Sequence, residues 1–152
     1  MSEAWHQVNF QSFMFERIIG FSIPVDEQLA VISYDAVYLV RLDNQGEVVK
    51  DSQYPEGGDI YDQERQLLSY RGTEFNILGL YGGNPLLLSR FGESVNIDKE
   101  REVASVQEAD GRLTLQFPFE DFSGDWVYAS FSEDSTYFLL GMPYDLYAFR
   151  RA

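Results

Sequence analysis

Histidine, the side chain most often used for proton transfer near neutral pH, occurs once in this sequence, as His6. A Ser-His-Asp triad or a histidine-ligated metal would need this residue, but positions near a terminus are usually poorly ordered, so we expect a structural or solvent-facing role. Cysteine is absent, which excludes disulfides, thiolate nucleophiles and cysteine-ligated zinc. Neither a phosphate-binding glycine loop nor an EF-hand spacing is present. The sequence therefore predicts no catalytic residue, no metal site and no cofactor.

Paired carboxylates are the remaining residues that could do chemistry, because glycosidases hold two of them a fixed distance apart. Adjacent acids occur at Glu120-Asp121 and Glu133-Asp134, with Asp125 between the two pairs. Such neighbours arise easily in an acid-rich chain, turns select aspartate for its backbone hydrogen bonds, and neighbours on a strand point to opposite faces. A carboxylate-dependent hydrolase is therefore our third hypothesis, and it requires a glutamate whose pKa lies well above the usual value of about 4.3.

The segment from Tyr54 to Glu64 is the longest gap between predicted strands, and long loops in compact domains are often functional. Tyrosines offer rigid contact area at low entropic cost, and the carboxylates add charge. A solvated connection is the competing interpretation. The candidate partner-binding residues are Tyr54, Glu56, Asp59, Tyr61, Asp62 and Glu64.

Acidic side chains dominate the sequence: 25 face only 11 basic ones, giving a formal net charge of −14. This charge repels phosphate backbones and anionic membranes, so we expect no nucleic-acid and no membrane partner, whereas a basic protein would be steered toward the chain. Our leading hypothesis is a non-catalytic protein-interaction module, in particular an acidic inhibitor or immunity-type protein that covers a basic active site. Charge that serves solubility alone is the alternative.

A carbohydrate- or small-ligand-binding β domain is the second hypothesis, with exposed tyrosine and tryptophan rings stacking on sugars. Trp5 and Trp126 would then lie on an open face. Trp126 begins an apolar strand, so we expect it to be buried. The three phenylalanines of Phe117–Phe122 form either core or an exposed patch, and alternation places Phe117 and Phe119 together in the core.

Short apolar runs separated by turns predict the elements, and the aromatic fraction of 16% favours strands. The length suits one domain covering residues 1–152, and the fold class is all-β with antiparallel, hairpin-rich sheets. The predicted strands are Phe13–Phe21, Gln28–Ser33, Val37–Leu42, Glu47–Lys50, Gln66–Tyr70, Phe75–Tyr81, Leu86–Phe91, Ser94–Ile97, Val103–Gln107, Arg112–Phe117, Trp126–Phe131, Tyr137–Gly141 and Leu146–Arg150.

Two connections carry hairpin signals. Asp110-Gly111 suits a type I′ turn, in which both central residues take positive φ. Asp43–Gly46 suits a slightly longer hairpin loop. Helical periodicity is weak, and Asp59–Tyr70 is interpreted as one helical turn or a loop.

An internal repeat links two parts of the chain. Phe21-Ser22 precedes Tyr34-Asp35 by the same interval at which Phe131-Ser132 precedes Tyr144-Asp145, and an acidic turn and an apolar strand lie between the members of each pair. A fainter third unit begins at Gly79. The segment Phe131–Phe149 resembles the middle strands of WD40-like β-propeller blades, a resemblance that covers about a third of the chain and implies propeller-like units. The Gly-His and Trp-Asp signatures of that family are missing, and a β-sandwich or barrel is the alternative.

Three such units are too few for a ring, since propellers typically need at least about four. A homodimer with two-fold symmetry would complete one and would cover the open strand edges. The N-terminal residues lack a basic region followed by an apolar run, and no stretch approaches about 20 apolar residues, so we expect a cytoplasmic protein.

Overall fold

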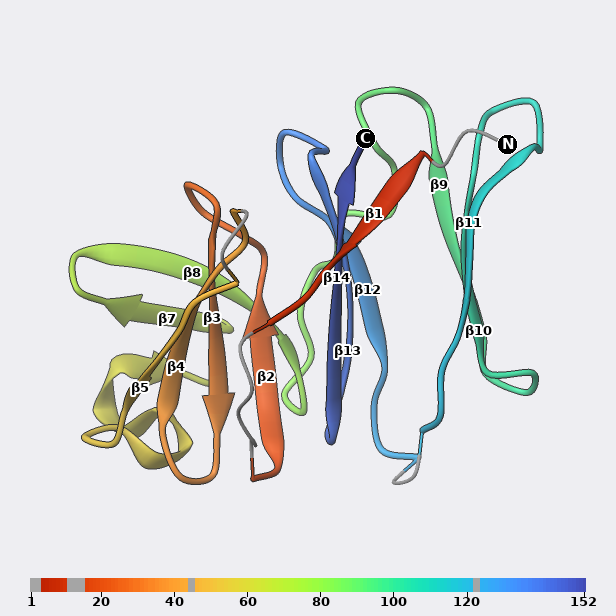
Figure 1. Cartoon of the computed structure of the whole chain (residues 1–152). Helices are drawn as coiled ribbons and strands as arrows, with labels where there is room; N and C mark the ends of the chain where they lie inside the picture. The colour runs from red at the N-terminus through yellow and green to blue at the C-terminus, as the bar shows by residue number, and fades with distance from the viewer. Residues whose placement is uncertain (1–3, 11–15, 44–45, 122–123) are drawn as a thin grey trace.

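The computed structural model describes residues 4–10, 16–43, 46–121 and 124–152, and these residues form strands joined by turns (Figure 1). Every strand pairing among them is antiparallel, which confirms the all-β, antiparallel class. The elements are β1 (Trp5–Val8), β2 (Ile18–Ser22), β3 (Gln28–Ser33), β4 (Val37–Arg41), β5 (Val48–Asp51), the 3-10 helix η1 (Pro55–Ile60), β6 (Tyr61–Asp62), β7 (Leu67–Tyr70), β8 (Thr73–Gly79), β9 (Ser94–Asp98), β10 (Val103–Gln107), β11 (Leu113–Pro118), β12 (Tyr128–Phe131), β13 (Tyr137–Met142) and β14 (Asp145–Arg151). Within the described ranges no helix is long and apolar enough to cross a membrane.

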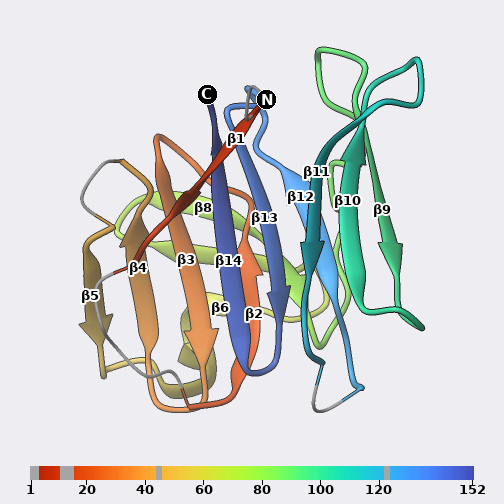
Figure 2. The same ribbon diagram turned by 45° about the vertical axis from the view of Figure 1, so that its right-hand side comes forward.

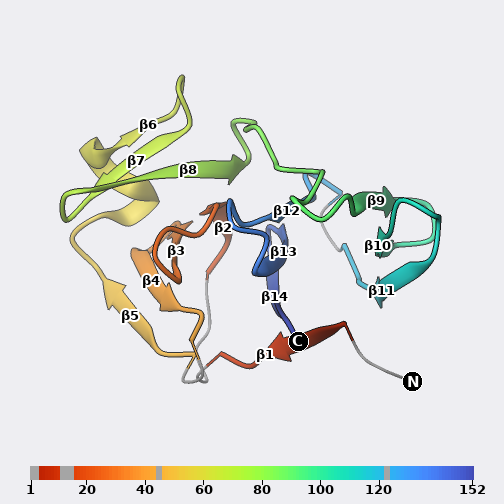
Figure 3. The same ribbon diagram turned by 90° about the horizontal axis from the view of Figure 1, so that it is seen from above.

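The strands form three sheets that lie side by side (Figures 2 and 3). A seven-stranded sheet has the order β5-β4-β3-β2-β8-β7-β6 and curls on itself. The middle sheet has the order β1-β14-β13-β12, and the third has the order β11-β10-β9. The middle sheet therefore joins strands from opposite ends of the sequence.

The middle sheet is buried on both faces, and the burial of β13 shows it most clearly. All six residues of β13 are buried, and because strand side chains alternate, they serve two cores. Leu139 packs with Phe21 and other residues of the seven-stranded sheet, whereas Leu140 packs with Ala104 and Val106 of the third sheet. A third core fills the curl of the seven-stranded sheet. Burying one such large apolar side chain contributes roughly 1.5–3 kcal/mol.

The repeat in the sequence corresponds to two three-stranded meanders, β2-β3-β4 and β12-β13-β14. The first phenylalanine of each copy, Phe21 or Phe131, is fully buried, and the tyrosines Tyr34 and Tyr144 are exposed at the second turns. The pairing differs between the copies. Phe21 lies opposite Val31, whereas Phe131 lies opposite Phe138, so the turn that follows Phe131 is the shorter of the two. Propeller-like repetition stays a prediction from the sequence.

One predicted strand, Leu86–Phe91, is wrong. The O of Leu87 accepts a hydrogen bond from Val95 N at 3.1 Å, whereas the O of Leu86 accepts one from Phe131 N at 2.9 Å. These bonds reach two different sheets, so no continuous ladder forms and only an isolated bridge at Leu88 remains. An apolar run therefore bridges the edges of β9 and β12 instead of extending either sheet.

The turn predicted at Asp110-Gly111 is not type I′. Gly111 N donates to Glu108 O at 2.9 Å and Glu108 N donates to Arg112 O at 2.8 Å, so three residues form the loop. Gly111 has φ 88°, but Asp110 does not have positive φ. This is a type I turn followed by a left-handed glycine, the usual three-residue hairpin.

Other boundaries differ less. The short strands β1 and β6 were not predicted, and the helical turn lies at Pro55–Ile60, earlier than the range Asp59–Tyr70 suggested. The predicted strand Phe13–Phe21 begins outside the described residues, and β2 starts at Ile18. The predicted hairpin loop Asp43–Gly46 also lies partly outside them.

Candidate functional site

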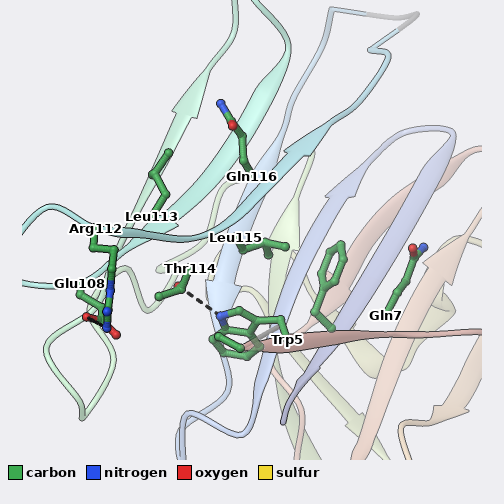
Figure 4. Close-up of a pocket in the computed structure, with 10 residues that line it drawn as sticks. Trp5, Gln7, Glu108, Arg112, Leu113, Thr114, Leu115 and Gln116 are labelled. Atoms are coloured by element: carbon green, nitrogen blue, oxygen red, sulfur yellow. Dashed lines mark hydrogen bonds and ion pairs between the residues drawn. The ribbon is translucent and has the colours of Figure 1, made fainter. Parts of the chain in front are cut away.

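The middle sheet extends beyond the third sheet by one strand. Phe117 of β11 faces β14, because its ring lies 4.8 Å from that of Tyr147 and 5.1 Å from that of Phe149. No described strand lies across from β1, which Figure 3 shows at the border of the middle sheet, beyond β11. The overhang leaves a groove of about 830 Å³ between β1, β14 and β11 (Figure 4). Its lining residues are Ala4, Trp5, Gln7, Glu108, Arg112, Leu113, Thr114, Leu115, Gln116 and Phe149.

The floor of the groove is one face of β1 and β14. Trp5 pairs with Arg151 and Gln7 pairs with Phe149, so these four side chains share the face that looks toward β11. Trp5 is only 5% exposed, and its indole Nε1–H donates a 3.4 Å hydrogen bond to Thr114 Oγ1. This bond, drawn in Figure 4, holds the floor against the wall at one point.

The wall of the groove is the free edge of β11, which pairs only with β10 among the described strands. Phe119 N donates to Glu102 O just beyond the strand. Because hydrogen-bonded and non-bonded pairs alternate in an antiparallel ladder, Phe117 and Leu115 point their backbone groups at β10 and Gln116 points its N–H and C=O at the free edge. Pro118 also faces that edge and lacks an N–H, the position at which a strand tolerates proline.

Arg151 lies next to the groove, opposite Trp5 in the pairing of β1 with β14. Its Nη2 and Nη1 donate to the two carboxylate oxygens of Glu93 at 2.6 and 3.1 Å, and its Nε donates to Ser135 O at 3.0 Å. The guanidinium also lies 4.4 Å from the ring centre of Trp5 and 4.6 Å from that of Phe91. Arg151 therefore uses Nε, Nη1 and Nη2 in hydrogen bonds within the chain, and this cation stabilises the fold.

The carboxylate of Glu93 is matched to this arginine. Burial works to raise the pKa of Glu93, but hydrogen bonds from Arg151 and Ser89 outweigh it and hold the pKa below its usual value. Nearby, Arg112 Nη2 donates to Glu108 Oε2 at 2.6 Å. Arg112 and Arg151 are therefore both paired with acids of the same chain.

Two acids near the start of β14, Asp145 and Glu120, lie outside the lining of the groove and carry unbalanced negative charge. Asp145 lies on the same face of β14 as Tyr147 and Phe149. Burial, and after it the charge of Glu120, raises the pKa of Asp145. Burial and both carboxylates also raise the pKa of Tyr147. Among the described residues, neither Asp145 nor Glu120 forms an ion pair.

The structure divides the predicted Tyr54–Glu64 site into two groups. Tyr61 is 7% exposed within the core of the curled sheet, and Tyr54 packs edge-on against Tyr70 at 6.1 Å. The four acids of the set are exposed: Glu56, Asp59, Asp62 and Glu64. Two tyrosines therefore pack inward while the carboxylates face solvent.

Local backbone geometry accounts for part of this segment. Glu56 adopts φ 59°, followed by two glycines at positive φ, which breaks η1 in its middle. Asp62 Oδ1 accepts hydrogen bonds from the N–H groups of Glu64 and Arg65 at 3.1 and 3.2 Å, so this carboxylate shapes a turn. Asp59, Tyr61 and Asp62 also line a second hollow of about 520 Å³ on the outer side of β6–β8.

The carboxylates proposed for a hydrolase mostly support turns. Asp125 forms an ion pair with Arg17. Asp134 Oδ1 accepts from Ser132 Oγ at 2.8 Å and from Thr136 N at 3.0 Å. Within the described ranges, no group of three His, Asp or Glu side chains is placed to hold a metal ion. Trp5 and Trp126, at 5% and 6% exposure, present no open indole face for a sugar ring.

No protein-family model, curated protein or solved structure matches this chain. The function is therefore argued from the groove and from the distribution of charge. The sequence did not indicate the groove, because β1 was not predicted and Trp5 and Thr114 lie far apart in the chain. A usable signal was Pro118 at the end of a predicted strand, since proline marks a sheet edge.

Proposed function

We propose that this chain is a non-catalytic protein-interaction module that binds a basic protein. The observation that carries the proposal is the state of its cations. Counting contacts among the described residues, nine of the 11 basic side chains contact a carboxylate or an aromatic ring of the same chain, six in ion pairs and three over rings. The excess of acidic side chains therefore determines the electrostatic potential around the molecule, which is negative.

Part of this excess lies together on the η1–β8 region. Four carboxylates of the Tyr54–Glu64 segment are exposed there, and Glu74 of β8 lines the same hollow as Asp59, Asp62 and the cation Arg65. A surface of this sign raises the association rate of a basic partner and rejects acidic ones. An inhibitor that covers a basic active site, such as that of a nuclease, is the specific form of the proposal.

Capture from a lysate of the source cells tests the proposal. The bait is the full chain, and bound proteins are eluted with a rising salt step and identified by mass spectrometry. We expect a basic protein that elutes with salt, because exposed charges are screened over about 10 Å at 0.1 M salt. Recovery of acidic proteins only, or of nothing but the chain itself, would overturn the proposal.

Two matched variants of the bait locate the charge that matters. One carries Glu56→Gln, Asp59→Asn and Glu64→Gln, and the other carries Glu47→Gln, Glu100→Gln and Glu133→Gln. Both lose three exposed charges, so a general effect of net charge weakens capture equally. Selective loss in the first variant assigns the contact to the predicted segment.

A further inference from the structure

The third sheet lacks the strand that would match β1. β14 and β11 face each other across their aromatic contacts, but β1 faces the groove. A fourth strand placed beside β11 would lie across from β1 and would make the third sheet as wide as the middle one. The groove thus lies where a fourth strand of the third sheet would pair with β11.

The chemistry of the lining suits an added strand. Gln116 directs its backbone N–H and C=O into this position, and Pro118 ends the pairing edge below it. A strand lying here would turn every second side chain toward Leu115 and Gln7 and would cover the small exposed parts of Trp5 and Phe149. The other side chains would face water.

The charge around the groove selects among occupants. Arg112 and Arg151 are paired with Glu108 and Glu93, whereas Asp145 and Glu120, which lie beyond the groove lining near the start of β14, have no cation partner among the described residues. A second copy of this chain would bring a net charge of −14 against the same charge. A basic segment fits this field, and another copy does not.

We infer that the groove binds an extended segment of a basic protein as a fourth strand beside β11, with a lysine or arginine of the segment reaching beyond the groove to Asp145 and Glu120. This inference rests on the proposed function, since it names how the basic partner is held. Main-chain hydrogen bonds to the edge would give affinity, and the alternate side chains would give selectivity, as in other cases of strand addition.

Titration of the full, 15N-labelled chain with designed peptides tests the inference directly. The probe is a peptide of about ten residues with alternating lysine and valine, long enough to follow β11. We expect shifts of the Gln116 amide and of the Trp5 indole N–H. Two control peptides serve for comparison, one with glutamate for lysine and one with proline for valine. Each should bind at least about tenfold more weakly, which corresponds to 1.4 kcal/mol.

A pair of variants at one position separates backbone pairing from side-chain contact. Gln116→Pro removes the edge N–H, and Gln116→Ala keeps it. We expect Gln116→Ala to bind the lysine–valine peptide and Gln116→Pro to lose at least about tenfold in affinity. Equal affinity of the two variants, or peptide shifts confined to the η1–β8 region, would overturn the inference. If Gln116→Pro fails to fold, the positions of the peptide-induced amide shifts on the unaltered chain decide whether the peptide binds beside β11.

The contribution of the Glu120 and Asp145 carboxylates to peptide binding is tested separately. Glu120→Gln with Asp145→Asn should weaken the lysine–valine peptide, and the control pair Glu47→Gln with Glu100→Gln should not. Concentration-dependent shifts of Gln116 without peptide would instead name a second copy as occupant and contradict the inference. A basic protein that is captured equally by the Gln116→Pro bait would leave the proposed function standing and refute the groove alone.

Discussion

The ring of Phe21 fills the space that a Cβ at Gly141 would occupy. Phe21 belongs to the seven-stranded sheet and Gly141 to the middle sheet, so this contact fixes how closely the two sheets approach. Close packing of this kind makes both residue types necessary, because added volume cannot be absorbed by neighbouring atoms.

Gly141→Ala should therefore destabilise the fold by about 2 kcal/mol through overpacking. Urea unfolding followed by circular dichroism measures the change. The double variant Gly141→Ala with Phe21→Leu should lose less than the sum of the two single variants, since the smaller side chain makes room. Strict additivity of the two effects would show that the ring does not limit the spacing.

Removal of the Tyr61 hydroxyl should stabilise the protein. This hydroxyl is buried and makes no hydrogen bond within the described residues, and burial followed by the charge of Tyr81 raises the pKa of Tyr61 to about 12. Tyr61→Phe should add about 1 kcal/mol to the free energy of unfolding, because a buried hydroxyl without a hydrogen-bond partner loses its hydration on folding and gains no bond in return. Tyr38→Phe is the contrast: its hydroxyl donates to Asp35 Oδ2 at 2.9 Å, so its removal should cost about 1 kcal/mol.

The Arg151–Glu93 pair should show strong coupling. Arg151→Met leaves a buried carboxylate without its partner and should destabilise by about 3 kcal/mol. Adding Glu93→Met should recover part of that loss, because two apolar side chains then replace the pair. Arg112→Met, which breaks the exposed pair with Glu108, should change stability by less than about 0.5 kcal/mol. A similar loss in both arginine variants would contradict the special role of Arg151.

Stability should respond to pH at Asp145 in an unusual direction. Because its pKa is raised in the folded state, ionised Asp145 opposes folding above the folded pKa, and this effect disappears below the ordinary value of 3.8. Asp145→Asn should therefore stabilise the protein by a few tenths of a kcal/mol at pH 7, since the site is partly exposed, and by nothing near pH 3. Unfolding curves at the two pH values measure the difference. A stabilisation that persists unchanged near pH 3 would assign it to packing instead of charge.

Local pattern was sufficient for the strands that carry most of the core. β3 and β10 begin and end at the residues that the sequence predicted, because each is a short apolar or alternating run bounded by turn residues. Leu86–Phe91 has the same composition, yet its hydrogen bonds divide between two sheets, and composition cannot reveal which partners are near. Predicted strands thus were reliable where their partners were adjacent hairpin strands.

The groove lay beyond such reasoning for a related reason. Trp5–Val8 is too short and too polar to stand out as a strand, and it becomes one only by pairing with β14. The Trp5–Thr114 contact likewise depends on the stacking of whole sheets. The acidic character was visible at once, but the sequence could not show that the cations are engaged internally.

The pairing of Trp5 with Arg151 also has a consequence for the order of folding. Nearly the whole chain lies between these two residues, so closing this contact loses far more chain entropy than any hairpin does. β1 should dock last, after the meanders have formed and stacked. The floor of the groove would then exist only in the completely folded molecule, so a partner that binds there cannot engage a half-folded chain.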